Sequence, residues 1–164
     1  TLASFISDVC GPLISPSDKP DVVRTPNSVE AALRAISAIR YKERLAAKGS
    51  PLQPVTIRNL LLAGTTLVEE DLTWLKIDNA VIKTGTSLVA CLLNGSMITA
   101  TLAASVNHRF YELNAHDCEM VGAVLNLRPA SELTPDNVAE PRNRRVEIVI
   151  VRRSVAALDS GGTP

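Results

Sequence analysis

Residues 142–151 read Arg-Asn-Arg-Arg-Val-Glu-Ile-Val-Ile-Val. In a strand, every second side chain points to the same side of the sheet. On the strand expected at residues 145–151, one face carries only valine and isoleucine, and the other carries Glu147 followed by two valines. A strand that is apolar on both faces is typical of the covered interior of a sheet. The end of the chain therefore predicts a sheet that other elements cover.

The clearest helix is expected from Asn27 to Lys48. The Asn27 side chain can cap its first turn, and Glu30 stands three residues further on, as in a capping box. Apolar side chains follow at helical spacing and predict one buried face: Val29, Leu33, Ile36 and Ile39. On the other face, Glu30 and Arg34 have the spacing of an i,i+4 ion pair. Gly49 after Lys48 predicts the end of the helix.

Shorter apolar runs predict the remaining elements. We expect strands at Val55–Leu62, Asn79–Lys83 and Val121–Leu127, and a brief helix with an acidic first turn at Leu67–Leu75. Residues 88–106 fit one long helical face, but Asn94-Gly95 between two apolar runs favours a hairpin, followed by a helix over residues 103–115. The sequence thus predicts an α+β fold, with a single mixed sheet packed by two or three helices. No internal repeat is apparent.

The length of 164 residues suits one folded unit. Residues 1–26 are expected to form an apolar N-terminal piece and a connector arm rich in proline. Residues 27–158 would form the α+β domain, and residues 159–164 a frayed tail. No apolar run reaches the length of a membrane span, so none is expected.

Charge is balanced overall but uneven along the chain. Lys+Arg and Asp+Glu both total 17, which argues against a general nucleic-acid binder. Residues 142–153 contain five arginines and one glutamate, a net charge of about +4. This cluster fits either a charged strand edge that discourages aggregation or an anion-binding site.

Residues with catalytic or metal-binding chemistry are sparse and poorly spaced. Cys10, Cys91 and Cys118 are far apart without a CxxC motif, so neither a zinc site nor a disulfide framework is expected, although one disulfide with a spare thiol stays open. His108 and His116 lie near Cys118, yet no second pair of ligands has finger-like spacing. No nucleophile, phosphate-binding or dinucleotide motif occurs. We therefore expect no enzyme activity, no metal and no cofactor.

Residues 128–151 resemble the end of OmpA-like domains, which include the periplasmic domain of MotB. The resemblance rests on Arg128-Pro129, the turn Thr134-Pro135-Asp136 and the run Arg142-Asn143-Arg144-Arg145-Val146-Glu147 before the last strand. It implies a βα-sandwich that binds the diaminopimelate-containing peptide of peptidoglycan without catalysis. The His-Thr-Asp ligand loop of that family has no counterpart in this sequence.

The resemblance implies four candidate ligand-binding residues: Arg142, Asn143, Arg144 and Arg145. Guanidinium groups pair bidentately with carboxylates such as those of peptidoglycan stem peptides. Arg144 or Arg145 would reach the ligand or hold the loops, and Asn143 would order the corner. Equally, Asn143, Arg144 and Arg145 could merely shape the last turn.

Two functions follow as hypotheses. The first is a non-catalytic cell-envelope module in the periplasm, whose partner is peptidoglycan or another anionic ligand. The alternative is a self-assembling structural subunit, such as a virion or filament coat protein, with an exchangeable N-terminal arm. The body is poor in aromatic residues, and an apolar, proline-containing arm suits exchange between neighbouring subunits. In that alternative the arginines could meet nucleic-acid phosphates or an acidic partner surface.

Overall fold

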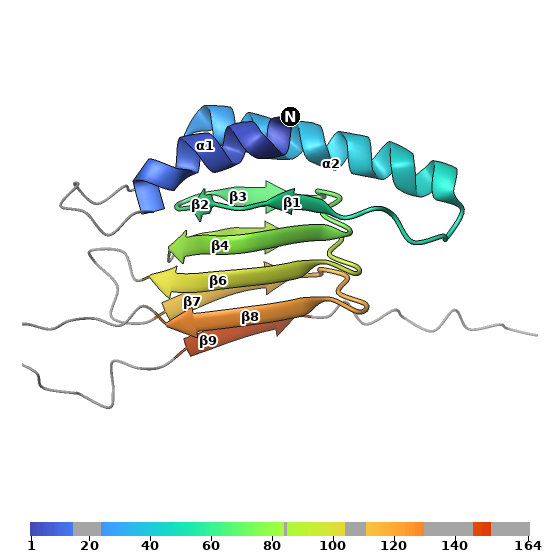
Figure 1. Ribbon diagram of the computed structural model, residues 1–164. Coiled ribbons are helices and arrows are strands. Elements are labelled where there is room, and N and C mark those ends of the chain that lie inside the picture. The colour runs from blue at the N-terminus through green and yellow to red at the C-terminus, as the bar shows by residue number, and fades with distance from the viewer. Residues whose placement is uncertain (15–23, 84, 104–110, 130–145, 152–164) are drawn as a thin grey trace, which may run out of the picture.

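The computed structural model of the protein describes residues 1–14, 24–83, 85–103, 111–129 and 146–151. Two helices, α1 (Leu2–Ile14) and α2 (Asn27–Ala47), lie side by side over one end of a stack of strands (Figure 1). The strands are short, and successive layers of the stack are formed by successive parts of the chain.

The strands form two sheets. One contains β1 (Val55–Ile57), β2 (Leu60–Leu62), β4 (Leu75–Lys83), β6 (Met97–Ala103) and β8 (Val124–Pro129). The other contains β3 (Thr66–Val68), β5 (Ser87–Val89), β7 (Tyr111–His116) and β9 (Val146–Val151). Every strand pair within the described residues is parallel. From β2 onward the chain alternates between the two sheets, so it winds as a parallel β-solenoid.

The α+β class and the packing of helices against a sheet are confirmed. The expectation of a single mixed sheet is wrong, because the structure has two sheets and parallel pairing. A coil returns to the same sheet only after crossing the other one, which leaves no place for a hairpin.

Register between coils gives the repeat length. Ile77 pairs with Ile98, and Ile98 pairs with Leu125, so equivalent residues are 21 and then 27 residues apart. Within the first coils, buried aliphatic residues recur every five residues: Leu62, Leu67, Leu72, Ile77 and Ile82, then Leu88, Leu93 and Ile98. The absence of a repeat expected from the sequence is thus wrong. Over residues 62–98, each segment of five residues contributes one large side chain to the core, apart from the six-residue step from Ile82 to Leu88.

The corners between the sides need left-handed backbone. Positive φ angles recur at equivalent positions on successive coils: Gly64 and Gly85, then Glu69, Ala90 and Asp117, then Trp74, Gly95 and Gly122. A left-handed residue turns the chain sharply within one position. Because several corners carry a residue other than glycine, the usual sequence mark of such a turn is missing.

Helix α2 confirms the prediction for residues 27–48 in its extent and its end. Lys48 adopts left-handed backbone at the C-cap. Its start differs from the expectation, because Pro26 is the N-cap and the helix has no side-chain capping bond. Ile39, expected on the buried face, is 48% exposed, whereas Arg40 is buried.

Three further expectations are wrong or partly wrong. Residues 67–75 form no helix, because Leu67 and Leu72 point into the core from two consecutive sides of a coil. Asn94-Gly95 turns the chain between two sheets instead of closing a hairpin, since β5 and β6 do not pair. Of the helix expected over residues 103–115, the described residues are Ala103, which ends the strand β6, and residues 111–115, which belong to the strand β7.

The strands expected near residues 55–62, 79–83, 121–127 and 145–151 are present as β1 and β2, the second half of β4, β8 and β9. At the other end of the chain, α1 packs against α2, β1 and β2, with Ile6 and Cys10 fully buried. No helix within the described residues has the length and apolar character needed to cross a membrane.

Candidate functional site

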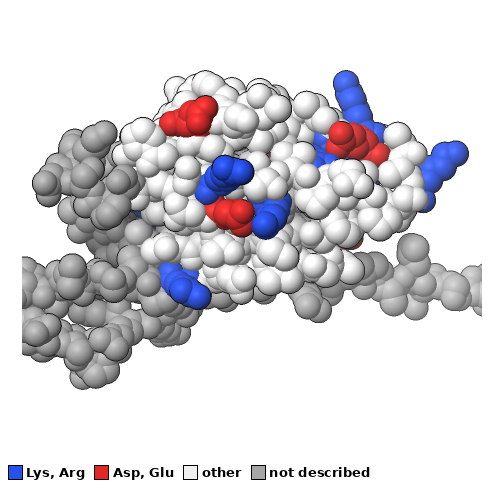
Figure 2. All heavy atoms as spheres, viewed as in Figure 1, with Lys and Arg blue, Asp and Glu red and all other residues white. Residues whose placement is uncertain are grey.

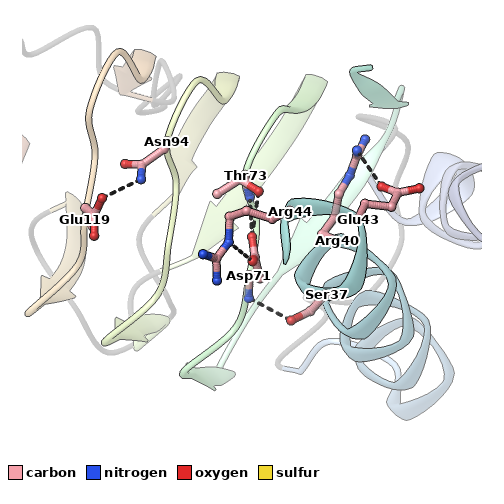
Figure 3. A network of polar contacts seen from close by, with 8 residues as sticks. All are labelled: Ser37, Arg40, Glu43, Arg44, Asp71, Thr73, Asn94 and Glu119. Atoms are coloured by element: carbon pink, nitrogen blue, oxygen red, sulfur yellow. Dashed lines mark hydrogen bonds and ion pairs between the residues drawn. The ribbon is translucent and has the colours of Figure 1, made fainter. Parts of the chain in front are cut away.

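Asp71 is the centre of a polar seam between α2 and the first coils (Figure 3). Its carboxylate accepts hydrogen bonds from Arg44 Nε at 2.6 Å and from the Thr73 hydroxyl at 2.6 Å. Its backbone N–H donates to Ser37 Oγ at 2.7 Å. Asp71 is 3% exposed, and charge-assisted bonds of this kind are the stronger ones in proteins. The seam therefore fixes α2 against the solenoid.

Two more residues of α2 reach the coils. Arg34 Nη1 lies 2.6 Å from Glu70 Oε1, and Glu30 accepts a hydrogen bond from the Thr65 hydroxyl. Glu30 and Arg34 thus each find a partner on the solenoid, in place of the i,i+4 pair that their spacing suggests. Glu70, expected in the first turn of a helix, instead lies on a coil side and is 8% exposed.

A groove of about 460 Å³ runs beside the seam and is lined by charges of both signs. Its basic residues are Arg34, Lys42 and Arg44, and its acidic residues are Glu69, Glu70 and Asp71. The Arg44 guanidinium lies 5.6 Å from the centre of the Tyr41 ring, within the range of a cation–π contact. On the face shown in Figure 2, acidic and basic side chains neighbour one another. The electrostatic potential in the groove is therefore not of a single sign.

One corner of the stack carries a ladder of hydrogen bonds. Asn94 Nδ2 donates to Glu119 at 2.6 Å (Figure 3). Asn94 Oδ1 accepts from the Val121 N–H at 2.8 Å. Along the backbone, Trp74 N–H donates to the Asn94 carbonyl and Gly95 N–H donates to the Val121 carbonyl. These bonds join three successive coils at one edge.

Within the described residues, the core rows are less buried at the β8 end of the solenoid than in its interior. Along the core rows, Leu93 is 1% exposed and Ile98 is 8% exposed, but their successors Met120 and Leu125 are only partly buried. Val121 is 71% exposed, and Val124 is 45% exposed, much as its register partner Met97 on the preceding coil is at 44%. We call these residues, with Leu127, the terminal face: Met120, Val121, Val124, Leu125 and Leu127. It lies at the opposite end of the stack from α1 and α2 (Figure 1).

The three cysteines are free thiols with core character. Burial raises the pKa of Cys10 and Cys118, and it raises the pKa of Cys91 to about 11. Cys118 lies one coil after Cys91, because the next residues, Leu92 and Glu119, are bridged in register. A raised pKa leaves little thiolate, so these groups are poor nucleophiles at neutral pH.

Candidate metal ligands do not converge in the described part of the chain. His116 ends β7, and His108 lies outside the described residues. Within the ranges that the structure describes, no three His, Cys, Asp or Glu side chains are close enough to hold a metal ion.

The four residues implied by the OmpA-like resemblance, Arg142, Asn143, Arg144 and Arg145, lie outside the described residues. The strand β9 begins directly after them at Val146 and pairs with β7.

Comparison of the chain with protein-family models, with curated proteins and with solved structures gave no match. By its own geometry the fold is a parallel β-solenoid whose first coils are covered by two helices.

Sequence reasoning missed both the polar seam and the terminal face. The seam has a weak signal, since arginines recur on one helix, but their partners are 27 to 36 residues away. The terminal face has a stronger sequence signal. The five-residue spacing of Leu and Ile predicts rows of core residues, and the last residues of these rows lie at the end of the solenoid.

Proposed function

We propose that this chain is a non-catalytic structural module that docks end to end with a second copy through the terminal face. The observation that carries the proposal is the unequal cover of the two ends of the solenoid. Terminal repeats of solenoids need a polar outer face to stay soluble as monomers. Here the helices cover one end, while at the other end Met120 and Leu125, which continue the buried rows of Leu93 and Ile98, are only partly buried.

The chemistry of this face favours a protein partner. Contiguous apolar surface at the end of a stack is typical of an interface, and a strand at the edge of a sheet readily accepts another strand. Within the described residues, β8 is the last strand of its sheet. Because the helices cover the other end, two copies that dock through this face would form a closed dimer.

The test is the molar mass in solution, measured by light scattering and sedimentation over a wide concentration range. We expect a mass that rises with concentration above 17.5 kDa. The variant Val124→Lys should reduce assembly, because lysine on an edge strand opposes strand pairing. The matched control is Val68→Lys on β3, since Val68 is 46% exposed and Val124 is 45% exposed. A monomer at all concentrations, or equal effects of the two variants, would contradict the proposal.

Peptidoglycan binding in the cell envelope is the second candidate. It is supported by the sequence resemblance alone, since the βα-sandwich that the resemblance implies differs from the parallel β-solenoid of the described residues. Saturable pelleting with purified sacculi, weakened in a variant with Arg144→Ala and Arg145→Ala, would favour it. Protein that stays in the supernatant at every sacculus concentration would exclude it.

A further inference from the structure

Cys91 and Cys118 are register partners on adjacent coils, since the paired residues before and after them in the ladder have the same offset of 27. Two backbone bonds hold the coils together around them. Glu119 N–H donates to the Cys91 carbonyl at 3.0 Å. On the other side, Ala90 N–H donates to the His116 carbonyl at 2.8 Å. Neighbouring strands lie about 4.8 Å apart, and the Cα atoms of a disulfide are about 4.4–6.8 Å apart. The backbone therefore holds the two cysteines at a distance that a disulfide can span.

The two thiols also have equivalent orientations. Cys118 Sγ lies 3.5 Å from the Leu88 carbonyl oxygen, on the coil that carries Cys91. Cys91 Sγ lies 3.4 Å from the Leu67 carbonyl oxygen, again one coil earlier. Each thiol is thus directed toward the preceding coil, so Cys118 is directed toward the coil of Cys91. Burial raises the pKa of Cys118, and hydrogen bonds to the backbone and side chain of Cys91 partly offset this rise, as expected for two thiols in contact.

The third cysteine lies elsewhere in the fold. Cys10 is fully buried on α1, and its thiol bonds to the backbone of Leu61 on β2. Cys91 lies between β5 and β6, and Cys118 lies between β7 and β8. Three cysteines allow three pairings, and the register between coils brings together one of them. The pairing that the sequence leaves open is therefore chosen by the fold.

We propose that Cys91 and Cys118 form a disulfide in an oxidising environment, with Cys10 as the spare thiol. The thiolate of Cys118, the partly exposed member of the pair, attacks a small disulfide such as oxidised glutathione, and one glutathione leaves. The Cys91 thiolate then attacks the Cys118 sulfur and displaces the second glutathione. The two cysteines lose two protons and two electrons, which convert the oxidised glutathione into two thiols.

Burial determines when this exchange takes place. A buried thiol forms little thiolate, so the exchange proceeds while the coils are folding and both groups are still in water. The finished disulfide is neutral and suits the apolar interior. Without an oxidant both groups stay free thiols, as in the structure.

The bond links one coil to the next and closes a loop of 27 residues. A disulfide stabilises the folded state mainly by restricting the unfolded chain. For a loop of this length, the chain-entropy relation gives an increase of up to about 400-fold in the ratio of folded to unfolded protein. The bond lies within one chain and needs no second copy, so it is independent of the proposed assembly.

The test is refolding of the full chain from urea in a glutathione redox buffer at mildly alkaline pH, followed by peptide mapping without reduction. We expect one linked pair of peptides, which contain Cys91 and Cys118, and a free Cys10. The urea midpoint of the oxidised protein should be higher than that of the same sample after reduction. All samples are kept at one low protein concentration, so that assembly does not contribute. Cysteines that stay reduced, or a mixture of the three pairings, would overturn the proposal.

Two variants distinguish the pair from the spare thiol. Cys10→Ala should keep both the linked peptides and the fall of the urea midpoint on reduction. Cys118→Ala should lose both, and its midpoint should be the same with and without reductant. A fall on reduction that persists in Cys118→Ala would contradict the assignment, as would a wild-type midpoint that rises on reduction. Peptide mapping of the wild-type chain decides the pairing even where a variant does not fold.

Discussion

Replacing Gly95 with alanine tests the corner geometry of the solenoid. Gly95 has a φ angle of +65°, and an added Cβ would lie 2.7 to 3.0 Å from three ring atoms of Trp74. Two costs therefore add. Left-handed backbone costs an alanine about 1–2 kcal/mol, and overpacking against the ring costs about 1–3 kcal/mol. The free energy of unfolding should fall by roughly 2–5 kcal/mol in total.

Gly122→Ala separates these two costs. Gly122 occupies the same corner one coil later, with a φ angle of +68°, and an added Cβ would meet nothing within 4 Å. This variant should lose about 1–2 kcal/mol, the backbone cost alone. Urea unfolding followed by far-ultraviolet circular dichroism measures both variants, and the slope with urea checks that unfolding stays two-state.

The same alanine substitution in a protein that lacks the Trp74 ring is a further test. In a Trp74→Gly protein the ring is gone, so Gly95→Ala should cost no more than Gly122→Ala does. If the two alanine variants differ by less than about 0.5 kcal/mol in the native background, the close contact with Trp74 is refuted.

Three further predictions concern buried polar groups. Asp71→Asn should lower the free energy of unfolding by about 1–3 kcal/mol, whereas Asp78→Asn, whose carboxylate is 45% exposed, should change it by less than about 1 kcal/mol in the same urea experiment. Thr25→Val should cost about 1–3 kcal/mol, because the Ala63 N–H loses its acceptor at 2.8 Å, and Thr25→Ser should restore most of the loss in thermal unfolding. Stability should fall as the pH rises from 9 to 11, because the Cys91 thiol ionises in the unfolded chain while burial keeps its folded pKa at about 11. The fall attributable to this group is up to about 3 kcal/mol, and Cys91→Ala should lack it in urea titrations across that range.

The helix α2 and the strand β9 could be predicted from the sequence because their signals are local. In α2, apolar residues recur at 3.6-residue spacing and Lys48-Gly49 ends the pattern. In β9, an unbroken apolar run predicts a strand whichever neighbours it has. Local patterns fix the type of such an element but leave its partners open.

The solenoid could not be predicted in this way, because its period is neither helical nor that of a strand. A five-residue spacing places one large side chain on each side of a coil. Where further leucines intervene, as Leu92 and Leu102 do beside Leu88 and Ile98, a short window resembles helical spacing. Two of these four, Leu88 and Ile98, belong to the five-residue pattern. A count of matches to a period of five over residues 62–82, and again over residues 88–98, would have revealed the repeat.

Candidate site residues escaped prediction for a different reason. Arg34 has an acidic neighbour at helical spacing, but the structure pairs it with Glu70 on the solenoid. The local pair is worth only a few tenths of a kcal/mol, so tertiary packing determines which partner is used. The buried Arg40 has a sequence signal, because an arginine at an apolar helix position needs partners, yet that signal does not name Glu43 and Gln53.

The coil-to-coil construction links the proposed assembly to stability. In a solenoid each coil contacts its neighbours, so the last coil is stabilised from one side by protein and from the other by whatever binds there. Side-chain burial decreases from Leu93 to Met120 and from Ile98 to Leu125, which occupy equivalent positions on successive coils. A second copy bound at the terminal face would restore this cover, and by mass action it would stabilise the last coil more as concentration rises. Amide exchange in β8 should therefore slow with protein concentration while exchange in β4, already enclosed between β1, β2 and β6, stays constant.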